Sequence, residues 1–300
     1  LIAISRFWAE RVNYSENKKA YVILGVTGPN EYENNVNNNW YTNYLAQWCL
    51  LYTTKEILKI KKIHPQHWNK IKQKVSWQES EIDKWNQIAT QIHFPRHPEN
   101  GIFLQQDGFL DKTIIPASSI DKSEKPINQH WSWDRILRSP FIKQADVLQG
   151  LYLFEENFDY EFIKKHFDFY EPLTVHESSL SACVHSILAS RLGRIEKAYS
   201  LYLRTSRLDL DDYNKEVEEG LHITSMAGTW MSLVQGFGGV RIVNNQLHID
   251  SILPKSWEKY NFRIIYKNTS INVEVDKKKV NIIHSNPNLS IYCHGELVNI

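Results

Sequence analysis

The stretch Gly25–Asn43 combines residues that could carry out acid chemistry with residues that would hold them in place; it reads GVTGPNEYENNVNNNWYTN. Because glycine tolerates positive φ and proline fixes φ, Gly28 and Pro29 predict a tight turn that holds the next side chains in one direction. Glu31 is the nearer carboxylate presented in this way, and Glu33 follows two residues later. A carboxyl group held in a fixed direction is suited to general acid catalysis, so we interpret this stretch as an active-site loop.

Asparagines are dense in the second half of the same stretch, at Asn34, Asn35, Asn37, Asn38 and Asn39. Their side chains donate and accept hydrogen bonds without carrying charge, which suits either turn capping or binding of a hydroxyl-rich ligand. Both interpretations stay open. A single exposed glutamate in a turn is usually just a solvated residue, so the prediction depends on the whole stretch.

A second stretch, Leu221–Val234, could bind an anion. Apolar residues recur there at helical spacing, at Ala227, Trp230, Met231 and Val234. This spacing predicts a helix with His222, Thr224 and Ser225 at its amino terminus, where unpaired N–H groups and the positive end of the helix dipole attract anions. Ordinary capping by serine and threonine is the alternative.

The GPNEY turn followed by asparagines resembles the catalytic-acid segment of glycoside hydrolase family 65, the inverting disaccharide phosphorylases. Matching blocks follow in the same order at residues 105–112 (QQDGFLDK), 127–150 (INQHWSWDRILRSPFIKQADVLQG) and 203–239, and cover most of the chain. The resemblance implies that Glu31 is the general acid. It also implies that inorganic phosphate is a co-substrate and that no metal or organic cofactor is used.

The same resemblance implies roles for two further groups of residues. Lys143 and Gln144 would contact the sugar and the incoming phosphate, whereas the HITS loop with His222, Thr224 and Ser225 would bind the phosphate. An apolar stripe predicts a helix over 142–154, with Lys143 and Gln144 at its start. Without the resemblance, these two would be an ordinary surface pair.

The fold class predicted is mainly α: part of an (α/α)6 helical barrel over 1–238, followed by a small carboxy-terminal β-sandwich domain over 239–300. Helical spacing is found at 1–14, from Asn39 onward, at 77–94 and in the paired segments 180–193 and 195–202. In the helix after Asn39, the spacing of Tyr41, Leu45, Trp48 and Tyr52 predicts one apolar face. Pro65 should end it. Short alternating runs at 247–249, 262–266, 271–275 and 280–283 predict strands.

Composition excludes several classes of protein. A net charge of +1 gives no reason to expect nucleic-acid binding, and no run reaches the roughly 18 apolar residues that cross a membrane. The three cysteines are too widely spaced for a disulfide framework or a CxxC metal site, so we expect a reducing cytoplasm. The segment around His176, Glu177 and His185 lacks the HExxH pattern, and the acidic run 209–220 departs from a calcium-binding loop, so no metal site is predicted.

The resulting hypothesis is inverting phosphorolysis of maltose to β-glucose 1-phosphate and glucose. Trehalose or kojibiose phosphorolysis, hydrolysis of an α-glucoside, and a non-catalytic carbohydrate-binding fragment are the alternatives. A hydrolase would need a second carboxylate, for which Glu33, Glu177 and Glu219 are candidates. The resemblance also implies a possible homodimer. It further implies that an amino-terminal β-sandwich and the first part of the barrel precede Leu1.

Overall fold

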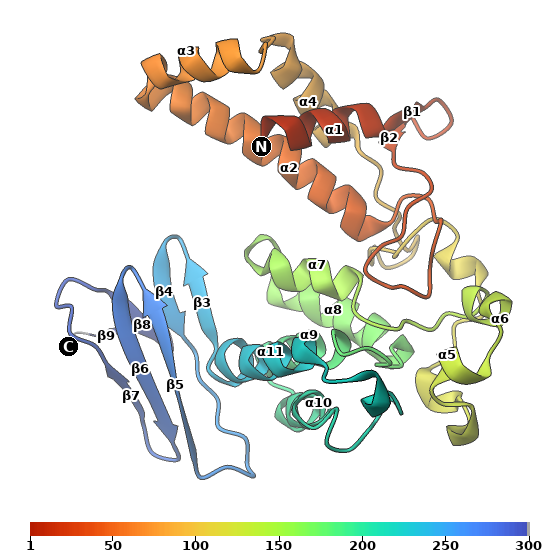
Figure 1. The fold of residues 1–300 in the computed structure, drawn as a ribbon, viewed down its shortest axis with the longest axis vertical. Coiled ribbons are helices and arrows are strands. Elements are labelled where there is room, and N and C mark those ends of the chain that lie inside the picture. Colours follow the sequence, from red (N-terminus) through yellow and green to blue (C-terminus); the bar gives the residue numbers. More distant parts are fainter. Residues whose placement is uncertain (299–300) are drawn as a thin grey trace. The chain divides into compact units, whose positions relative to one another are not determined.

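The computed structural model describes residues 1–298, and the chain divides into two compact units (Figure 1). The first unit comprises Leu1–Ile115 and Trp133–Pro140, and the second comprises Pro116–Ser132 and the chain from Phe141 onward. Each unit is described by itself. Among residues 1–298, no helix is both long and apolar enough to cross a membrane.

The first unit is helical, with one short hairpin. Its elements are α1 (Ile2–Arg11), the hairpin strands β1 (Asn13–Ser15) and β2 (Ala20–Val22), α2 (Trp40–Ile63), α3 (Pro65–Lys74), α4 (Ser80–Gln91), a 3-10 turn (Phe109–Asp111) and α6 (Trp133–Leu137). Three tryptophans, Trp68, Trp77 and Trp85, stack edge to face in its core. The predicted end of α2 is confirmed, since the helix stops at Ile63 and Pro65 starts α3.

The predicted apolar face of α2 was wrong. Trp48 and Tyr52 are exposed and stack on each other, while the buried face carries Trp40, Leu50 and Ile57. This buried face also contains polar residues that have hydrogen-bond partners: the Asn43 side-chain amide donates to the His93 carbonyl at 2.7 Å, and Thr53 accepts from Ser5 at 2.8 Å. A buried polar side chain with a partner costs little, so hydrophobicity alone pointed to the wrong face.

The second unit continues with helices and ends in strands. Its helices are α5 (Ile127–His130), α7 (Val147–Leu153), α8 (Tyr160–Tyr170), α9 (Ser181–Arg191), α10 (Ile195–Ser206) and α11 (Ile223–Met231), which runs into a π-helical segment (Ser232–Phe237). Short 3-10 turns lie at Ala117–Ser119, Lys122–Glu124, Glu155–Asn157, Glu171–Leu173 and Val217–Glu219. The predicted pair is confirmed: α9 and α10 pack together, joined by a short connection in which Gly193 has a φ of +69°.

Helix α11 packs closely on α9 through small residues. Its buried face holds Ser225 and Gly228, whereas Trp230 of the predicted apolar stripe is half exposed. A Cβ atom at Gly228 would lie only 2.8 Å from the Cβ of Cys183, so this approach requires glycine. The predicted stripe was therefore wrong about the face, although it placed the amino terminus of the helix correctly, at His222.

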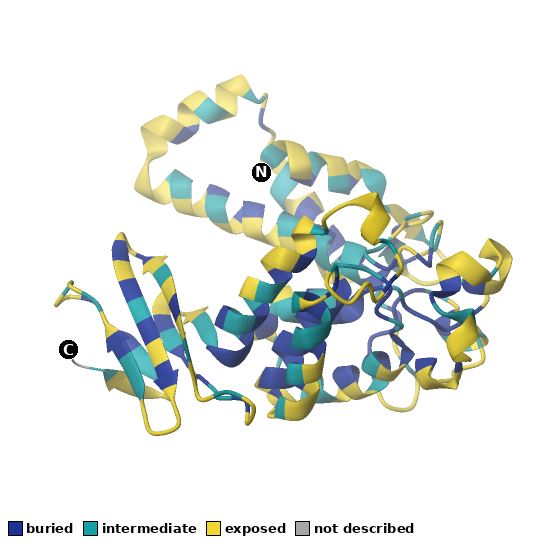
Figure 2. Cartoon of the chain, turned by 60° about the horizontal axis from the view of Figure 1, so that its bottom comes forward, coloured by how far each residue is buried: buried dark blue, intermediate teal, exposed yellow. Residues whose placement is uncertain are grey.

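The predicted carboxy-terminal strands are confirmed and form two sheets. The strands are β3 (Val240–Val243), β4 (Gln246–Ile249), β5 (Lys259–Tyr266), β6 (Thr269–Asp276), β7 (Val280–Ile283), β8 (Ile291–Cys293) and β9 (Glu296–Val298). One sheet has the order β3-β4-β8-β9, with β4 and β8 parallel, and the other the antiparallel order β5-β6-β7. Buried and exposed residues alternate along β6 (Figure 2), and residues of both sheets share one apolar core. The architecture is thus mainly helical with a small β-domain, as predicted.

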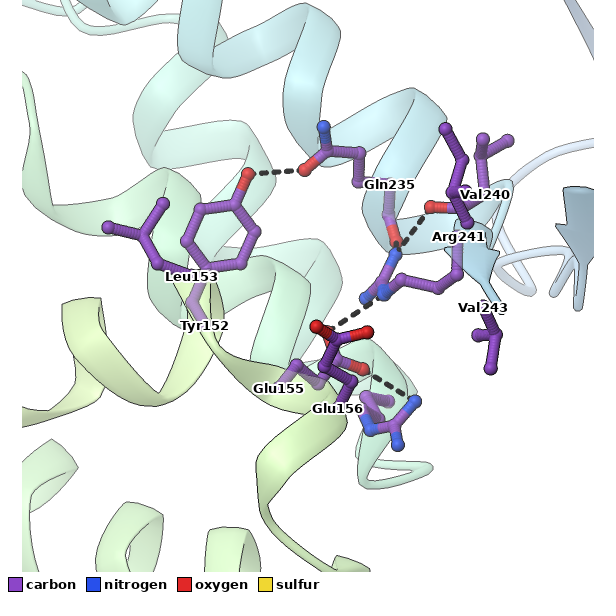
Figure 3. Close-up of a pocket in the computed structure, with 10 residues that line it drawn as sticks. Tyr152, Leu153, Glu155, Glu156, Gln235, Val240, Arg241 and Val243 are labelled. Carbon is purple, nitrogen blue, oxygen red and sulfur yellow. Dashed lines mark hydrogen bonds and ion pairs between the residues drawn. The ribbon is translucent and has the colours of Figure 1, made fainter. Parts of the chain in front are cut away.

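Polar contacts join the β-domain to the helices that precede it. Arg241 of β3 donates to Glu155 at 2.8 Å (Figure 3). Arg191 at the end of α9 pairs with the same carboxylate at 2.5 Å. Tyr260 donates to the carbonyl of Phe237 at 2.7 Å. The predicted boundary at residue 238 falls at this junction, inside the second unit.

Candidate functional site

Glu31 lies on a loop of the first unit whose two ends are joined to each other by backbone hydrogen bonds. Val26 and Val36 exchange two N–H to carbonyl bonds of 2.9 Å and so close the loop between them. Inside it, the N–H of Glu33 donates to the carbonyl of Asn30 at 3.1 Å. This is the bond of a β-turn over residues 30–33, which places Glu31 at the second position of the turn.

Amide side chains hold the start of this turn. Asn30 is fully buried; its side chain donates to Gln105 at 3.3 Å, and its side-chain oxygen accepts from the Tyr32 N–H at 3.3 Å. The carbonyl of Gln105 in turn accepts from the Trp40 N–H at 2.8 Å and the Asn39 side chain at 3.2 Å. The QQDGFLDK block therefore supports the turn from behind.

Four of the five clustered asparagines support the backbone. Asn39 caps α2 by accepting from the Thr42 N–H at 2.9 Å, and Asn37 accepts from the Gly25 N–H at 3.1 Å. Asn35 and Asn38 have positive φ, each 55°, which asparagine tolerates better than most residues. Of the two roles left open for the cluster, these four positions take the structural one.

Two details of the predicted turn were wrong. Gly28 does not have positive φ; the glycine of this loop with positive φ is Gly25, at 59°, and the turn itself lies later, over residues 30–33. Glu31 is exposed, whereas its neighbours Tyr32 and Glu33 are buried.

The end of the turn is held by an ion pair. Glu33 is 6% exposed and pairs with Lys112, which also donates to the carbonyl of Ser139 at 3.0 Å. Burial lowers the pKa of Lys112 to about 8. Sequence reasoning missed this lysine, although it is the last residue of the QQDGFLDK block.

Lys143 and Gln144 lie in the second unit, in the segment before α7. The prediction that they start a helix was wrong, because α7 begins at Val147. Instead, Ile142 pairs with the backbone of Thr174 in an isolated bridge, and the turn that follows carries the two side chains. Gln144 is 4% exposed, and its side-chain oxygen has no hydrogen-bond partner in the part of the chain that the structure describes. It is therefore a buried acceptor that the described residues leave unused.

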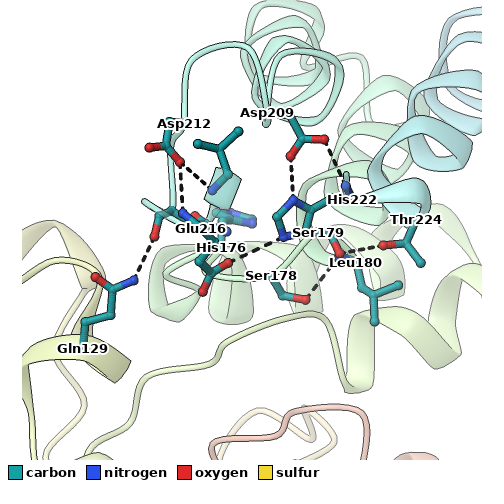
Figure 4. Close-up of polar contacts among 12 residues, drawn as sticks. Gln129, His176, Ser178, Ser179, Leu180, Asp209, Asp212, Glu216, His222 and Thr224 are labelled. Carbon is teal, nitrogen blue, oxygen red and sulfur yellow. Dashed lines mark hydrogen bonds and ion pairs between the residues drawn. The ribbon is translucent and has the colours of Figure 1, made fainter. Parts of the chain in front are cut away.

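His222 precedes α11 and is oriented by Asp209 (Figure 4). The ring Nδ1 donates to the Asp209 carboxylate at 2.5 Å, and the backbone N–H of His222 donates to the other oxygen at 3.0 Å. These hydrogen bonds lower the pKa of Asp209. The ring Nε2 lies 3.8 Å from Glu216. The acidic run 209–220 thus contributes two residues to the surroundings of this histidine.

Thr224 and Ser225 occupy the first turn of α11 but point in different directions. Thr224 is exposed, and its hydroxyl lies 2.6 Å from that of Ser179 (Figure 4). Ser225 is buried and donates its hydroxyl to the carbonyl of Thr205 at 2.5 Å. Of the three residues, His222 and Thr224 therefore present polar side chains at the helix amino terminus, whereas the side chain of Ser225 anchors the helix.

The candidate second carboxylates have different surroundings. Glu177 is 4% exposed and accepts from the Ile127 N–H at 2.9 Å. Glu33 is paired with Lys112, and Glu219 is exposed at the end of a 3-10 turn. Glu31 and Glu33 belong to the first unit, whereas Glu177, Glu219 and the residues at 143–144 and 222–225 belong to the second.

Comparison with known proteins identifies the family. Residues 1–231 match the glycosyl hydrolase family 65 central catalytic domain, and residues 240–300 match the carboxy-terminal domain of the same family. The chain is 52% identical over 280 residues to maltose phosphorylase of Bacillus subtilis, covering 93% of this chain and 36% of that protein. It is 41% identical over 281 residues to α,α-trehalose phosphorylase of Thermoanaerobacter brockii, with the same coverage of both proteins.

A solved structure described as a putative kojibiose phosphorylase from human microbiome is also similar, with a TM-score of 0.90 and 37% identity over 99% of this chain and 43% of that one. The chain thus spans little more than a third of the length of the curated relatives that it matches. The fold, the order of the motifs and these matches agree, and the chain belongs to glycosyl hydrolase family 65.

Proposed function

We propose that the complete gene product is an inverting disaccharide phosphorylase in which Glu31 is the general acid. Cleavage of a glycosidic bond with inversion needs an acid that protonates the departing oxygen and a nucleophile on the opposite face of the sugar. Phosphate can itself be that nucleophile. One carboxylic acid and one anion site then suffice, without a metal or an organic cofactor.

The observation that carries this proposal is the difference between Glu31 and Glu33. Glu31 is exposed at the second position of its turn, whereas Glu33 is buried and neutralised by Lys112. A hydrolase would need a second carboxylate to activate water. Glu33 and Glu177 are both buried and hold protein partners, so they are poorly suited to that task.

The second unit offers groups suited to the other substrates. Thr224 and His222 lie at the amino terminus of α11, where backbone N–H groups and the helix dipole favour an anion such as phosphate. The buried oxygen of Gln144 can accept from a sugar hydroxyl. We assign the phosphate to His222 and Thr224, and the sugar to the turn that carries Lys143 and Gln144.

Maltose is the substrate that we propose. Identity is 52% to a maltose phosphorylase, 41% to a trehalose phosphorylase and 36% to a kojibiose phosphorylase from Halothermothrix orenii. Since residues of the acceptor site decide which linkage is cleaved, trehalose and kojibiose are the alternative substrates.

The test is glucose release from maltose with and without inorganic phosphate, using the complete gene product and the 300-residue chain side by side. Release that requires phosphate, with β-glucose 1-phosphate as the other product, is the expected result. Release without phosphate would identify a hydrolase. Phosphate-dependent consumption of trehalose or kojibiose in place of maltose would retain the mechanism and overturn the substrate.

A further inference from the structure

Lys112 and Glu33 form a buried pair whose partners are 79 positions apart in the chain. The side chain of Lys112 is 13% exposed and that of Glu33 is 8% exposed. Lys112 donates at the same time to the carbonyl of Ser139, which ties the end of the 30–33 turn to the segment that follows α6. A charge-assisted pair with a second hydrogen bond is held in a defined geometry.

This pair lies next to the proposed acid. Glu33 closes the turn with its own N–H, and two residues of extended chain span roughly 7 Å at most, which limits the separation of the Glu31 and Glu33 Cα atoms. A charge on Glu33 that lacked its counter-ion would therefore be felt at the Glu31 carboxyl group. Lys112 cancels that charge.

We propose that Lys112 is a positioning residue for Glu31: it fixes the end of the turn that presents the acid, and it neutralises the neighbouring carboxylate. The inference depends on the proposed function, because it assigns a task to Lys112 in that reaction. Glu33, the other carboxylate of the stretch, then acts neither as a base nor as a solvated surface residue.

The electrostatic part of this role has a definite sign. A general acid works while it is protonated, so activity falls at high pH as the acid ionises. In Lys112→Met, the Glu33 carboxylate has no counter-ion and opposes ionisation of Glu31. The alkaline limb of the pH profile of kcat/KM therefore moves to higher pH by roughly 0.5 to 1.5 units. In the double variant Lys112→Met with Glu33→Gln, neither charge is present, and the limb returns to its position in the unaltered protein.

The experiment measures the pH dependence of kcat/KM for phosphorolysis in the complete gene product. The variants are Lys112→Met, Lys112→Arg and the double neutral variant. Arg6 and Glu81 supply the control: they form an ion pair in the same unit, between α1 and α4, with N to O distances of 2.7 and 2.9 Å. Arg6→Met should lower thermal stability without moving the alkaline limb.

We expect a large loss of kcat in Lys112→Met and partial retention of kcat in Lys112→Arg. In the double variant, the alkaline limb of the pH profile should return to its position in the unaltered protein. If the limb of Lys112→Met coincides with that of the unaltered protein and activity falls only in step with thermal stability, as in Arg6→Met, the inference is overturned. If the unaltered protein has no phosphate-dependent activity, the proposed function fails first, and the role of Lys112 fails with it.

Discussion

The backbone N–H of Glu33 donates to the carbonyl of Asn30 at 3.1 Å, within the loop that carries both carboxylates. It closes a turn whose first and last residues are buried, while Glu31 between them is exposed. The direction of Glu31 is therefore set by anchors on either side of it, Gln105 behind Asn30 and Lys112 behind Glu33. A rigid support of this kind is what the proposed proton donor requires.

Replacing Glu31 by glutamine should abolish turnover while the protein stays folded. The amide keeps the shape of the side chain but cannot donate the proton, and a general acid contributes roughly 10² to 10⁴ in rate. The measurement is kcat for phosphorolysis of maltose, with circular dichroism to check the fold. A glucoside whose leaving group is acidic, such as 4-nitrophenol, should lose much less activity because it needs little protonation.

Glu99 provides the control for this change. It is another exposed glutamate of the first unit, on a loop after α4, and Glu99→Gln should leave turnover unchanged. Near-normal turnover in Glu31→Gln would remove Glu31 as the acid.

Asp209→Asn should weaken phosphate binding more than sugar binding. Asp209 accepts both from the ring and from the backbone N–H of His222, and an amide in its place loses the charge that orients the ring. Hydrogen bonds to a charged group contribute about 1.5 to 3 kcal/mol, so the KM for phosphate should rise at least roughly 10-fold. The KM for the disaccharide should change little.

The nearby Asp211 gives a matched comparison. It pairs with Arg207 on the surface at 2.7 Å and is exposed, so Asp211→Asn should leave both KM values in place. Equal changes in the KM for phosphate and the KM for the disaccharide in Asp209→Asn would indicate a general structural effect instead of a role in the anion site.

Local patterns predicted the elements of this fold well and their buried faces poorly. Pro65, Asn39 and Gly193 marked helix ends correctly, because each acts through its own backbone conformation or hydrogen bonds. The buried faces of α2 and α11 contain Asn43 and Gly228, which no hydrophobic pattern selects. These faces are determined by hydrogen bonds and close packing with distant segments.

The candidate site shows the same limit. The motif identified Glu31, and helical spacing placed His222 at a helix amino terminus, since both signals are local. Lys112 pairs with Glu33 from 79 positions away, and Asp209 contacts His222 from 13 positions away; neither has a periodicity that would identify it. Contacts of this kind appear only when the chain is folded.

Gly228→Ala should destabilise the protein and disturb the anion site together. The new methyl group would lie 2.8 Å from the Cβ of Cys183, and overpacking of this kind costs roughly 1 to 3 kcal/mol. If α11 moves away from α9 to relieve the contact, Thr224 moves with it, so the KM for phosphate should rise as the melting temperature falls. Ala227→Ser, at an exposed position next to it, is the control and should change neither.

The free energy of unfolding should decrease as the pH falls below 6.5, because His185 is buried in its neutral form in α9. Burial and the neighbouring His176 lower the pKa of His185 to about 3. The folded-state value lies below the unfolded value of 6.5, so this stabilisation is complete above pH 6.5 and is lost as the pH falls toward 3. Between pH 6 and 5, the free energy of unfolding should decrease by about 1.2 kcal/mol from His185 alone. Urea denaturation at several pH values measures this slope, which should be shallower in His185→Gln. His67 is an exposed histidine of α3, and His67→Gln should leave the slope unchanged. Equal slopes in the unaltered protein and His185→Gln would mean that the ring of His185 can take up a proton in the folded state without cost.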